Sequence, residues 1–188
     1  DLRNKALSHC KYEWIFSLDS DERCTKELRD EILNIINQDI NKVKHDIYFV
    51  PRKNYFMGKW IKYSGWYPNY RQPQLFKKGA MSYTMDSVHE GYIINKNNLS
   101  NPVGYLKQDL WQIPFENLKQ LIYKADRYSD LGVEKLANKN ISPSLFKALY
   151  KGSWVFIKHY IFKKGFLDGW PGFIIALGNF EGTFYRYI

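Results

Sequence analysis

The sequence predicts an α/β protein, and three features support that class. Short apolar runs of strand length alternate with an amphipathic helical pattern in the first part of the chain. Beyond residue 110 the pattern becomes mainly helical. The chain has 188 residues, 45% of them hydrophobic and 25% charged, which is typical of a globular protein and excludes a disordered or low-complexity class.

The first predicted strand, residues 14–18, ends in three carboxylates within four residues. Because successive side chains of an extended chain point to opposite faces, Asp19 and Asp21 project to the same side. Two converging carboxylates repel each other unless a divalent cation that prefers oxygen ligands, Mg²⁺ or Mn²⁺, lies between them. The alternative is an acidic turn that leads into the next helix, with Thr25 as its N-cap. Spacing alone leaves both interpretations open.

The segment after this turn predicts one helix and several strands. Residues 25–38 form an amphipathic helix, because their apolar side chains recur at helical spacing. Residues 52–73 are rich in Gly, Tyr, Trp and Pro without clear periodicity, which predicts a long ordered loop. Further strands are expected at residues 46–50, 74–76 and 82–88, and a polar turn at residues 97–102.

Two helices are predicted in the last part of the chain. Asn117 is suited to cap the first, whose apolar stripe extends to Tyr128. Ser142, followed by Pro143 at the first helical position, opens a second helix that runs to about Phe162.

A tight turn is predicted directly after the second helix. Gly165 ends that helix, and Gly169, Pro171 and Gly172 follow at close spacing. We expect Asp168, inside the turn, to cap backbone N–H groups rather than to take part in chemistry.

The charge and aromatic content indicate a polyanionic partner. The formal net charge is +9, and 18% of the residues are aromatic. Such a surface suits nucleic acid or an anionic membrane. Interleaved lysines and aromatic residues toward the C-terminus are typical of an interfacial helix, and no nucleic-acid-binding module accompanies them. We therefore expect a membrane surface and no nucleic acid; the alternative is a helix that covers the main domain and whose lysines are only solvated.

The two cysteines, Cys10 and Cys24, have neither metal-ligand spacing nor a disulfide pattern, which predicts reduced thiols in a cytosolic compartment. The apolar stretches are too short to span a bilayer.

The run Arg3 to Leu7 precedes the acidic stretch Trp14 to Arg23, and seven short blocks follow them in a fixed order. They are Pro51 to Tyr55, Gly58 to Ile61, Gly65 to Pro68, Gln74 to Phe76, Val88 to Glu90, Arg127 to Ser129 and Gly165 to Trp170. Together these segments resemble family 2 glycosyltransferases with the GT-A fold, in the branch that adds sugars to the lipopolysaccharide core or related surface glycans. The resemblance implies a hexosyltransferase-type enzyme.

The resemblance also implies a domain organisation. Residues 1–110 correspond to part of a GT-A catalytic domain, with the metal and acceptor side, and residues 111–188 to a helical extension whose basic and aromatic composition predicts association with a membrane. In such enzymes a first strand, a nucleotide-binding loop and another carboxylate precede the acidic motif. We therefore expect the chain to be the C-terminal part of a longer enzyme; the alternative is a truncated, non-catalytic binding module or remnant.

The resemblance assigns roles in an inverting, metal-dependent transfer. Asp19 and Asp21 hold Mn²⁺ or Mg²⁺, which stabilises the departing diphosphate. Glu90 is the general base for the acceptor hydroxyl. Arg3 and Asp19 contact the donor. The alternatives are a surface arginine at position 3 and a surface salt bridge between His89 and Glu90.

Further contacts are expected for the acceptor and the metal. Trp60, Trp66, Tyr67 and His89 are expected to contact the acceptor sugar, although the three aromatic residues suit a core equally well. Gln112 stands where many relatives have a metal-binding histidine, and since an amide is a weaker ligand, the third metal contact stays open.

The implied partners are a nucleotide-diphospho-sugar donor, a glycan or lipid-linked acceptor and an anionic membrane. The implied location is cytoplasmic, peripheral to the inner face of the bacterial plasma membrane.

Overall fold

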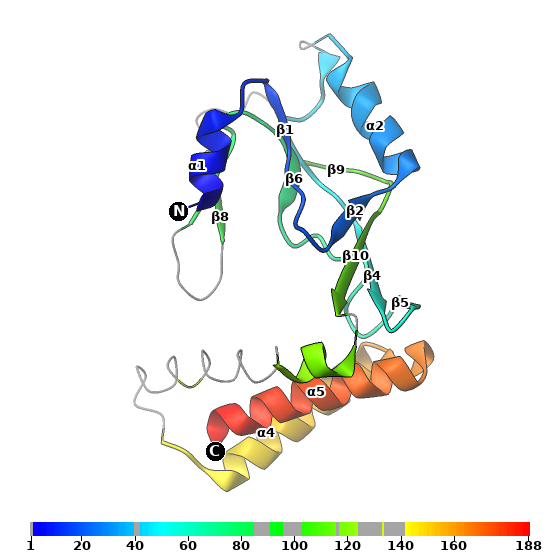
Figure 1. Cartoon of the computed structure of the whole chain (residues 1–188). Coiled ribbons are helices and arrows are strands. Elements are labelled where there is room, and N and C mark those ends of the chain that lie inside the picture. Colours follow the sequence, from blue (N-terminus) through cyan, green and yellow to red (C-terminus); the bar gives the residue numbers. More distant parts are fainter. Residues whose placement is uncertain are drawn as a thin grey trace. The chain divides into compact units, whose positions relative to one another are not determined.

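The structure, a computed structural model, describes residues 2–39, 42–84, 91–95, 103–115, 117–123, 133 and 142–188. The chain forms two compact units (Figure 1). Unit 1 comprises Asp1–Arg52 and Asn69–Gln112, and unit 2 comprises Lys53–Pro68 and Ile113–Ile188. Helices and mixed sheets make up the described chain, so the predicted α/β class is confirmed.

A four-stranded mixed sheet forms the centre of unit 1. Its order is β1 (Trp14–Phe16), β6 (Pro73–Lys77), β3 (Ile47–Phe49) and β9 (Gly104–Tyr105). β6 runs antiparallel to both of its neighbours, and β9 runs parallel to β3. The strands predicted at residues 14–18, 46–50 and 74–76 are therefore confirmed, with ends shifted by one or two residues.

Alternate side chains of this sheet enter two separate cores. Tyr48 and Leu75 face a core completed by the helix α2 (Lys26–Ile36). Their chain neighbours Ile47 and Phe76 face the opposite core, which includes Leu7 of the helix α1 (Leu2–His9). Figure 1 shows α1 and α2 on opposite sides of β1 and β6. This arrangement follows from the two-residue period of extended strands.

The helix α2 begins at the predicted cap. The Thr25 hydroxyl accepts a hydrogen bond from the Leu28 amide at 3.1 Å and donates one to the Asp109 carbonyl at 2.9 Å. Leu28 and Ile32 are buried on its inner face. Thr25 therefore caps α2 and also fixes its start to the loop before β10.

Four short strands of unit 1 complete the sheets. β7 (Met81–Tyr83) pairs antiparallel with β8 (Tyr92–Ile94), and β2 (Glu22–Cys24) pairs antiparallel with β10 (Leu110–Phe115), which continues into unit 2. The strand expected at residues 82–88 corresponds in part to β7, but residues 85–90 and the turn at 97–102 lie outside the described residues. β2 and β10 were not among the predicted elements.

A hairpin occupies the start of unit 2, where a loop was expected. β4 (Arg52–Phe56) and β5 (Lys59–Ile61) pair antiparallel through the two-residue turn Met57–Gly58. Both turn residues have positive φ, 49° and 77°, as a type I′ turn requires. The predicted loop over residues 52–73 is therefore wrong for its first ten residues.

The first predicted helix of unit 2 is described over residues 118–123, and Asn117 caps it by accepting a hydrogen bond from the Gln120 amide at 3.0 Å. The second is α4 (Leu145–Ile157), continued by the π-helix η3 (Lys158–Phe162). Its N-cap is Ser144, not Ser142, because the extended Ser144 presents its hydroxyl to the Lys147 amide. The predicted end near Phe162 is confirmed.

A further helix, α5 (Trp170–Tyr187), runs antiparallel to α4 and was not predicted (Figure 1). The Ser144 amide at the start of α4 donates to the Tyr187 carbonyl at the end of α5, at 2.9 Å. A Cβ atom on Gly152 would lie 3.0 Å from the Phe180 ring, so the glycine permits the close approach of α4 and α5. In the described part of the chain, no helix combines the length and apolar character needed to cross a membrane.

The turn before α5 contains a buried carboxylate, in the 3₁₀ segment η4 (Gly165–Asp168). Asp168 accepts hydrogen bonds from the backbone amides of Lys62 and Tyr63 and from the Ser64 hydroxyl, at 3.0 to 3.1 Å. The predicted capping role of Asp168 is confirmed, and its partners lie in the segment that follows β5.

Candidate functional site

The acidic stretch forms a tight turn between β1 and β2. The Glu22 amide donates to the Asp19 carbonyl at 3.0 Å, and the Glu22 carboxylate accepts from the Asp19 amide at 3.0 Å. Two hydrogen bonds between the same two residues therefore close the turn. This closure limits the positions that the side chains of Asp19 and Asp21 can adopt.

Glu22 is anchored in the interior of unit 1. Its Oε1 lies 2.8 Å from Nε of Arg52, and the two side chains are 0% and 1% exposed. Gln74 donates a hydrogen bond to its Oε2 at 2.8 Å. Nη1 and Nη2 of Arg52 are buried without a hydrogen-bond partner among the described residues.

Burial is the main influence on the protonation of this pair. It raises the pKa of Glu22, and the nearby carboxylates of Asp19 and Asp21 raise that pKa further, while the Asp19 amide and the Arg52 charge oppose the shift. Burial likewise lowers the pKa of Arg52. Both Asp19 and Asp21 are therefore close enough to Glu22 to affect its charge.

The carboxylates of Asp19 and Asp21 each have a polar neighbour from a distant part of the chain. Asp19 forms an ion pair with Arg3 at 2.8 Å, and the two side chains are 25% and 30% exposed. Asp21 accepts a hydrogen bond from Nε2 of Gln112 at 3.0 Å. Gln112 stands opposite Glu22 in the β2–β10 ladder, which explains this contact. The structure thus brings together four predicted site residues: Arg3, Asp19, Asp21 and Gln112.

Arg3 is positioned by the start of α1. The neighbouring Asn4 side chain forms two hydrogen bonds with the Tyr83 backbone, each 2.9 Å long. The Arg3 guanidinium lies 5.0 Å from the centre of the Tyr83 ring. The Tyr83 hydroxyl in turn lies 3.0 Å from the Ser17 hydroxyl. Arg3 therefore reaches Asp19 from a helix that is fixed to β7.

The donor atoms at this turn suit a hard cation. Asp19 and Asp21 offer carboxylate oxygens, and Gln112 has an amide oxygen beside Asp21. Mg²⁺ and Mn²⁺ prefer such oxygen ligands and commonly complete their shell with water or phosphate oxygens. Among the described residues, no group of three or more His, Cys, Asp or Glu side chains is placed to hold a metal ion. A cation here would therefore depend on ligands beyond these two carboxylates.

The aromatic residues expected to contact the acceptor lie in unit 2. Trp60 and Tyr67 are partly exposed and pack edge to face, with ring centres 5.3 Å apart. Lys53 Nζ lies 5.0 Å from the Trp60 ring centre. Trp66 packs against the core formed by Phe56, Ile61 and Ile175. Trp66 thus has a structural role, while Trp60 and Tyr67 keep partly exposed rings.

Two predicted site residues cannot be placed: His89 and Glu90 fall in 85–90, outside the described residues. Conversely, the anchoring residues Arg52 and Gln74 were not predicted. Their signal in the sequence is weak, because both stand in short strands where a polar residue suggests exposure.

Comparisons with known proteins point to one class of enzyme. No family model matches the chain. It is 24% identical over 182 residues to an uncharacterized glycosyltransferase of Rickettsia bellii (strain RML369-C), covering 89% of this chain and 58% of that protein. It is 25% identical over 176 residues to the uncharacterized glycosyltransferase RP128 of Rickettsia prowazekii (strain Madrid E), covering 92% of this chain and 60% of that protein.

A third relative carries a more specific name. The chain is 26% identical over 191 residues to the lipopolysaccharide core biosynthesis glycosyltransferase LpsC of Rhizobium meliloti (strain 1021), covering 97% of this chain and 64% of that protein. The chain thus spans less than two thirds of the length of these relatives. Their names support a transferase, and the chain is similar over most of its length to glycosyltransferases.

Proposed function

We propose that the protein takes part in a metal-dependent, inverting glycosyl transfer from a nucleotide-diphospho-sugar to a lipopolysaccharide-core or other lipid-linked glycan. The main support is the turn that holds Asp19 and Asp21 on a buried Glu22–Arg52 anchor, in a chain similar to proteins named glycosyltransferases. A GT-A fold of family 2 and a hexosyltransferase-type reaction complete the proposal.

The first step of the proposal is to bind the donor diphosphate. Asp19 and Asp21 would hold Mg²⁺ or Mn²⁺, with Gln112 as a further oxygen ligand. When bound, this cation acts as a Lewis acid on the phosphate oxygens of the donor. Arg3, 2.8 Å from Asp19, adds a positive charge near the same phosphates. The closed turn keeps both carboxylates in place while the leaving group departs.

The second step is attack by the acceptor. Glu90 takes the proton from the acceptor hydroxyl, whose oxygen forms a bond to the anomeric carbon. The bond from that carbon to the phosphate oxygen breaks, and the nucleoside diphosphate leaves. One displacement inverts the anomeric configuration. Trp60, Tyr67 and His89 would contact the acceptor, and a lipid-linked acceptor places the reaction at the inner face of the bacterial plasma membrane.

The test is the release of nucleoside diphosphate by the protein with Mn²⁺, a panel of nucleotide-diphospho-sugars and extracted lipopolysaccharide. Asp19→Asn and Asp21→Asn should each lower the release at least about 100-fold, the scale of losing one charge-stabilising group. Asp30→Asn, which alters an exposed carboxylate of α2, is the matched control. Unchanged release in both Asp19→Asn and Asp21→Asn would refute the proposed roles.

A second candidate is a non-catalytic binding module or remnant of such an enzyme. Calorimetry with nucleoside diphosphates and Mn²⁺ separates the two: a module that binds the glycan but no nucleotide supports this second candidate.

A further inference from the structure

The helix formed by α4 and η3 carries a stripe of apolar side chains that points away from α5. The residues of this stripe are Phe146, Tyr150, Trp154, Ile157, Ile161 and Phe162, and we call it the outer face. Successive members from Phe146 to Ile161 are three or four positions apart, which places them on one side of a helix. Phe162 joins them because its ring centre lies 5.9 Å from that of Trp154.

The outer face is separate from the core of unit 2. The opposite side of α4 is the one that meets α5, through the buried Ala148 and Gly152. By contrast, Phe146 is 81% exposed, Phe162 66%, Tyr150 61% and Trp154 50%. Large rings with this exposure are costly in water unless a partner covers them. The helix therefore has one side that is buried against α5 and a second apolar side that is exposed to solvent.

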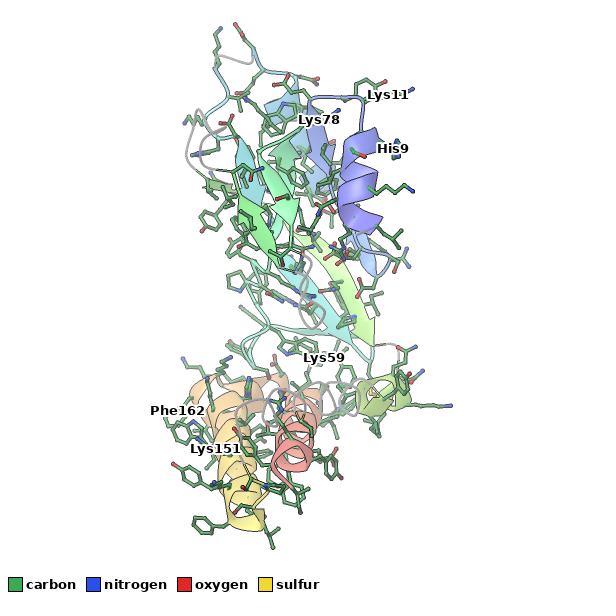
Figure 2. The ribbon with its side chains drawn as sticks, turned by 90° about the vertical axis from the view of Figure 1, so that its left-hand side faces the viewer. His9, Lys11, Lys59, Lys78, Lys151 and Phe162 are labelled. Carbon is green, nitrogen blue, oxygen red and sulfur yellow. The ribbon has the colours of Figure 1, made fainter. Side chains whose placement is uncertain are left out.

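The Lys, Asp and Glu residues of the segment that carries the outer face have a single sign of charge. Residues 142–167 contain five lysines and no Asp or Glu. Lys147, Lys151 and Lys158 lie on α4 and η3 and are exposed. Lys151 Nζ lies 5.8 Å from the centre of the Tyr150 ring, and Figure 2 labels Lys151 and Phe162 in this part of the chain. Within residues 142–167 the exposed rings are thus accompanied by positive charge only.

We infer that the outer face of α4 and η3 is a docking surface for an anionic lipid bilayer. The rings of Trp and Tyr are enriched at the level of the lipid headgroups. The apolar side chains can enter the boundary between the headgroups and the acyl chains. Lysines near an anionic leaflet are attracted by its negative surface potential. A second copy of the chain suits this face less well, because a two-fold contact would bring the lysines of both copies together.

This inference goes beyond the proposed transfer reaction, and its test needs neither donor nor acceptor. The intact chain is mixed with vesicles of phosphatidylcholine alone, or of phosphatidylcholine with phosphatidylglycerol, and bound protein is measured by flotation. We expect binding to the anionic vesicles at about 0.1 M salt and a strong decrease at about 1 M, since the screening length falls from about 10 Å to about 3 Å.

Two pairs of substitutions test the face itself. Phe146→Ser with Phe162→Ser, and Lys147→Glu with Lys151→Glu, should each lower binding to anionic vesicles at least about tenfold, because each removes well over 1.4 kcal/mol. The matched controls are Tyr12→Ser, a ring 82% exposed in unit 1, and Lys5→Glu with Lys11→Glu, two exposed lysines of unit 1; Figure 2 labels Lys11. Vesicle binding by the controls should stay within about twofold of that of the unchanged protein, because they alter unit 1 and leave the outer face intact.

Three outcomes would overturn the inference. One is no binding to anionic vesicles at low salt. Another is equal binding by the outer-face variants and the unchanged protein. The third is self-association in sedimentation that the Phe146→Ser, Phe162→Ser variant abolishes, without any lipid binding, which would assign the face to a second copy. In all three cases the test of Asp19 and Asp21 remains independent, because it is read from nucleotide release.

Discussion

Glu22 and Arg52 form an ion pair of 2.8 Å in which neither side chain is more than 1% exposed. The same carboxylate holds the Asp19 amide at 3.0 Å, so the pair lies directly behind the turn that carries both candidate metal ligands. A buried pair of this kind adds little net stability, but the loss of one partner leaves a charge without compensation. The pair therefore links the stability of unit 1 to the geometry of its acidic turn.

The first prediction follows from this burial. Arg52→Met should lower the free energy of unfolding by about 3–5 kcal/mol, because Glu22 then remains buried without its cation. Arg29→Met is the control: its ion pair with Asp30 has the same length, 2.8 Å, but its side chains are 60% and 50% exposed. That control should cost at most about 1 kcal/mol. Urea unfolding followed by circular dichroism measures both values.

A double change sharpens this test. Glu22→Gln combined with Arg52→Met removes both charges, and should cost less than the sum of the single changes because the residues are in direct contact. Equal losses for Arg52→Met and Arg29→Met, or simple additivity in the double variant, would contradict the prediction.

The central sheet and α2 could be predicted from the sequence because their buried positions are apolar. Leu28 and Ile32 have helical spacing, and in the central strands Ile47 and Phe76 are apolar and fully buried. In such segments the hydrophobic pattern and the burial pattern coincide. The class and the central elements of unit 1 follow from this agreement.

The hairpin of β4 and β5 could not be predicted, because the buried positions of β4 are partly polar. Arg52, Asn54 and Phe56 are buried in alternation, but only Phe56 is apolar. Arg52 is compensated by Glu22, and Asn54 donates to the Trp66 carbonyl at 2.8 Å. A buried polar side chain depends on partners that are distant in sequence, and the hydrophobic pattern of a segment contains no information about these partners.

The residues of the candidate site remain predictions, and the contacts that support them were not predicted. The acidic spacing and the family resemblance identified Asp19, Asp21 and Arg3, and the structure brings Arg3 to Asp19. The contact of Asp21 with Gln112 depends on the β2–β10 pairing, which joins segments that are far apart in the chain. Pairings of this kind depend on tertiary structure, which a single sequence does not specify locally.

The second prediction compares two glycines of α5. A Cβ atom at Gly172 would overlap with the carbonyl oxygen of Gly165, a backbone atom that cannot move aside. Gly172→Ala should therefore lower the free energy of unfolding by at least about 2 kcal/mol. At Gly178 the Cβ atom would lie 3.7 to 4.0 Å from Leu121, an ordinary contact. Gly178→Ala should raise the free energy of unfolding by about 0.5–1 kcal/mol, because alanine favours the helix.

Thermal unfolding of the two glycine variants tests these opposite changes in stability. A midpoint that falls for Gly172→Ala and rises for Gly178→Ala supports the close approach of η4 and α5. If both variants have the same unfolding midpoint as the unchanged protein, the prediction that α5 lies this close to η4 is wrong.

The third prediction concerns pH and His159. Burial lowers the pKa of His159 below 6.5, and the charges of Lys163 and Lys158 lower it further, while a hydrogen bond to the Val155 carbonyl opposes the shift. Below pH 6.5 the unfolded chain therefore binds a proton more readily than the folded one. The free energy of unfolding should decrease as the pH falls through and below 6.5.

His159→Gln removes this contribution. The difference in unfolding free energy between the unchanged protein and His159→Gln should shrink steadily as the pH falls from above 7 to about 5. A difference that is constant over this range, or that grows on acidification, would contradict the pKa direction of His159.

The last prediction separates chemistry from binding at Glu90. If this residue is the general base, Glu90→Gln should lower turnover by about 10² to 10⁴, because the acceptor hydroxyl then loses its proton without assistance. Donor affinity should stay near its original value, since the donor diphosphate is assigned to the Asp19 and Asp21 turn. His89→Gln is the matched change: in a mere surface salt bridge, each substitution would remove the same weak interaction, worth at most about 1 kcal/mol, and the two variants would behave alike. Single-turnover kinetics and calorimetry of donor binding on both variants therefore distinguish a general base from a salt bridge. An unchanged turnover in Glu90→Gln would remove this residue from the mechanism.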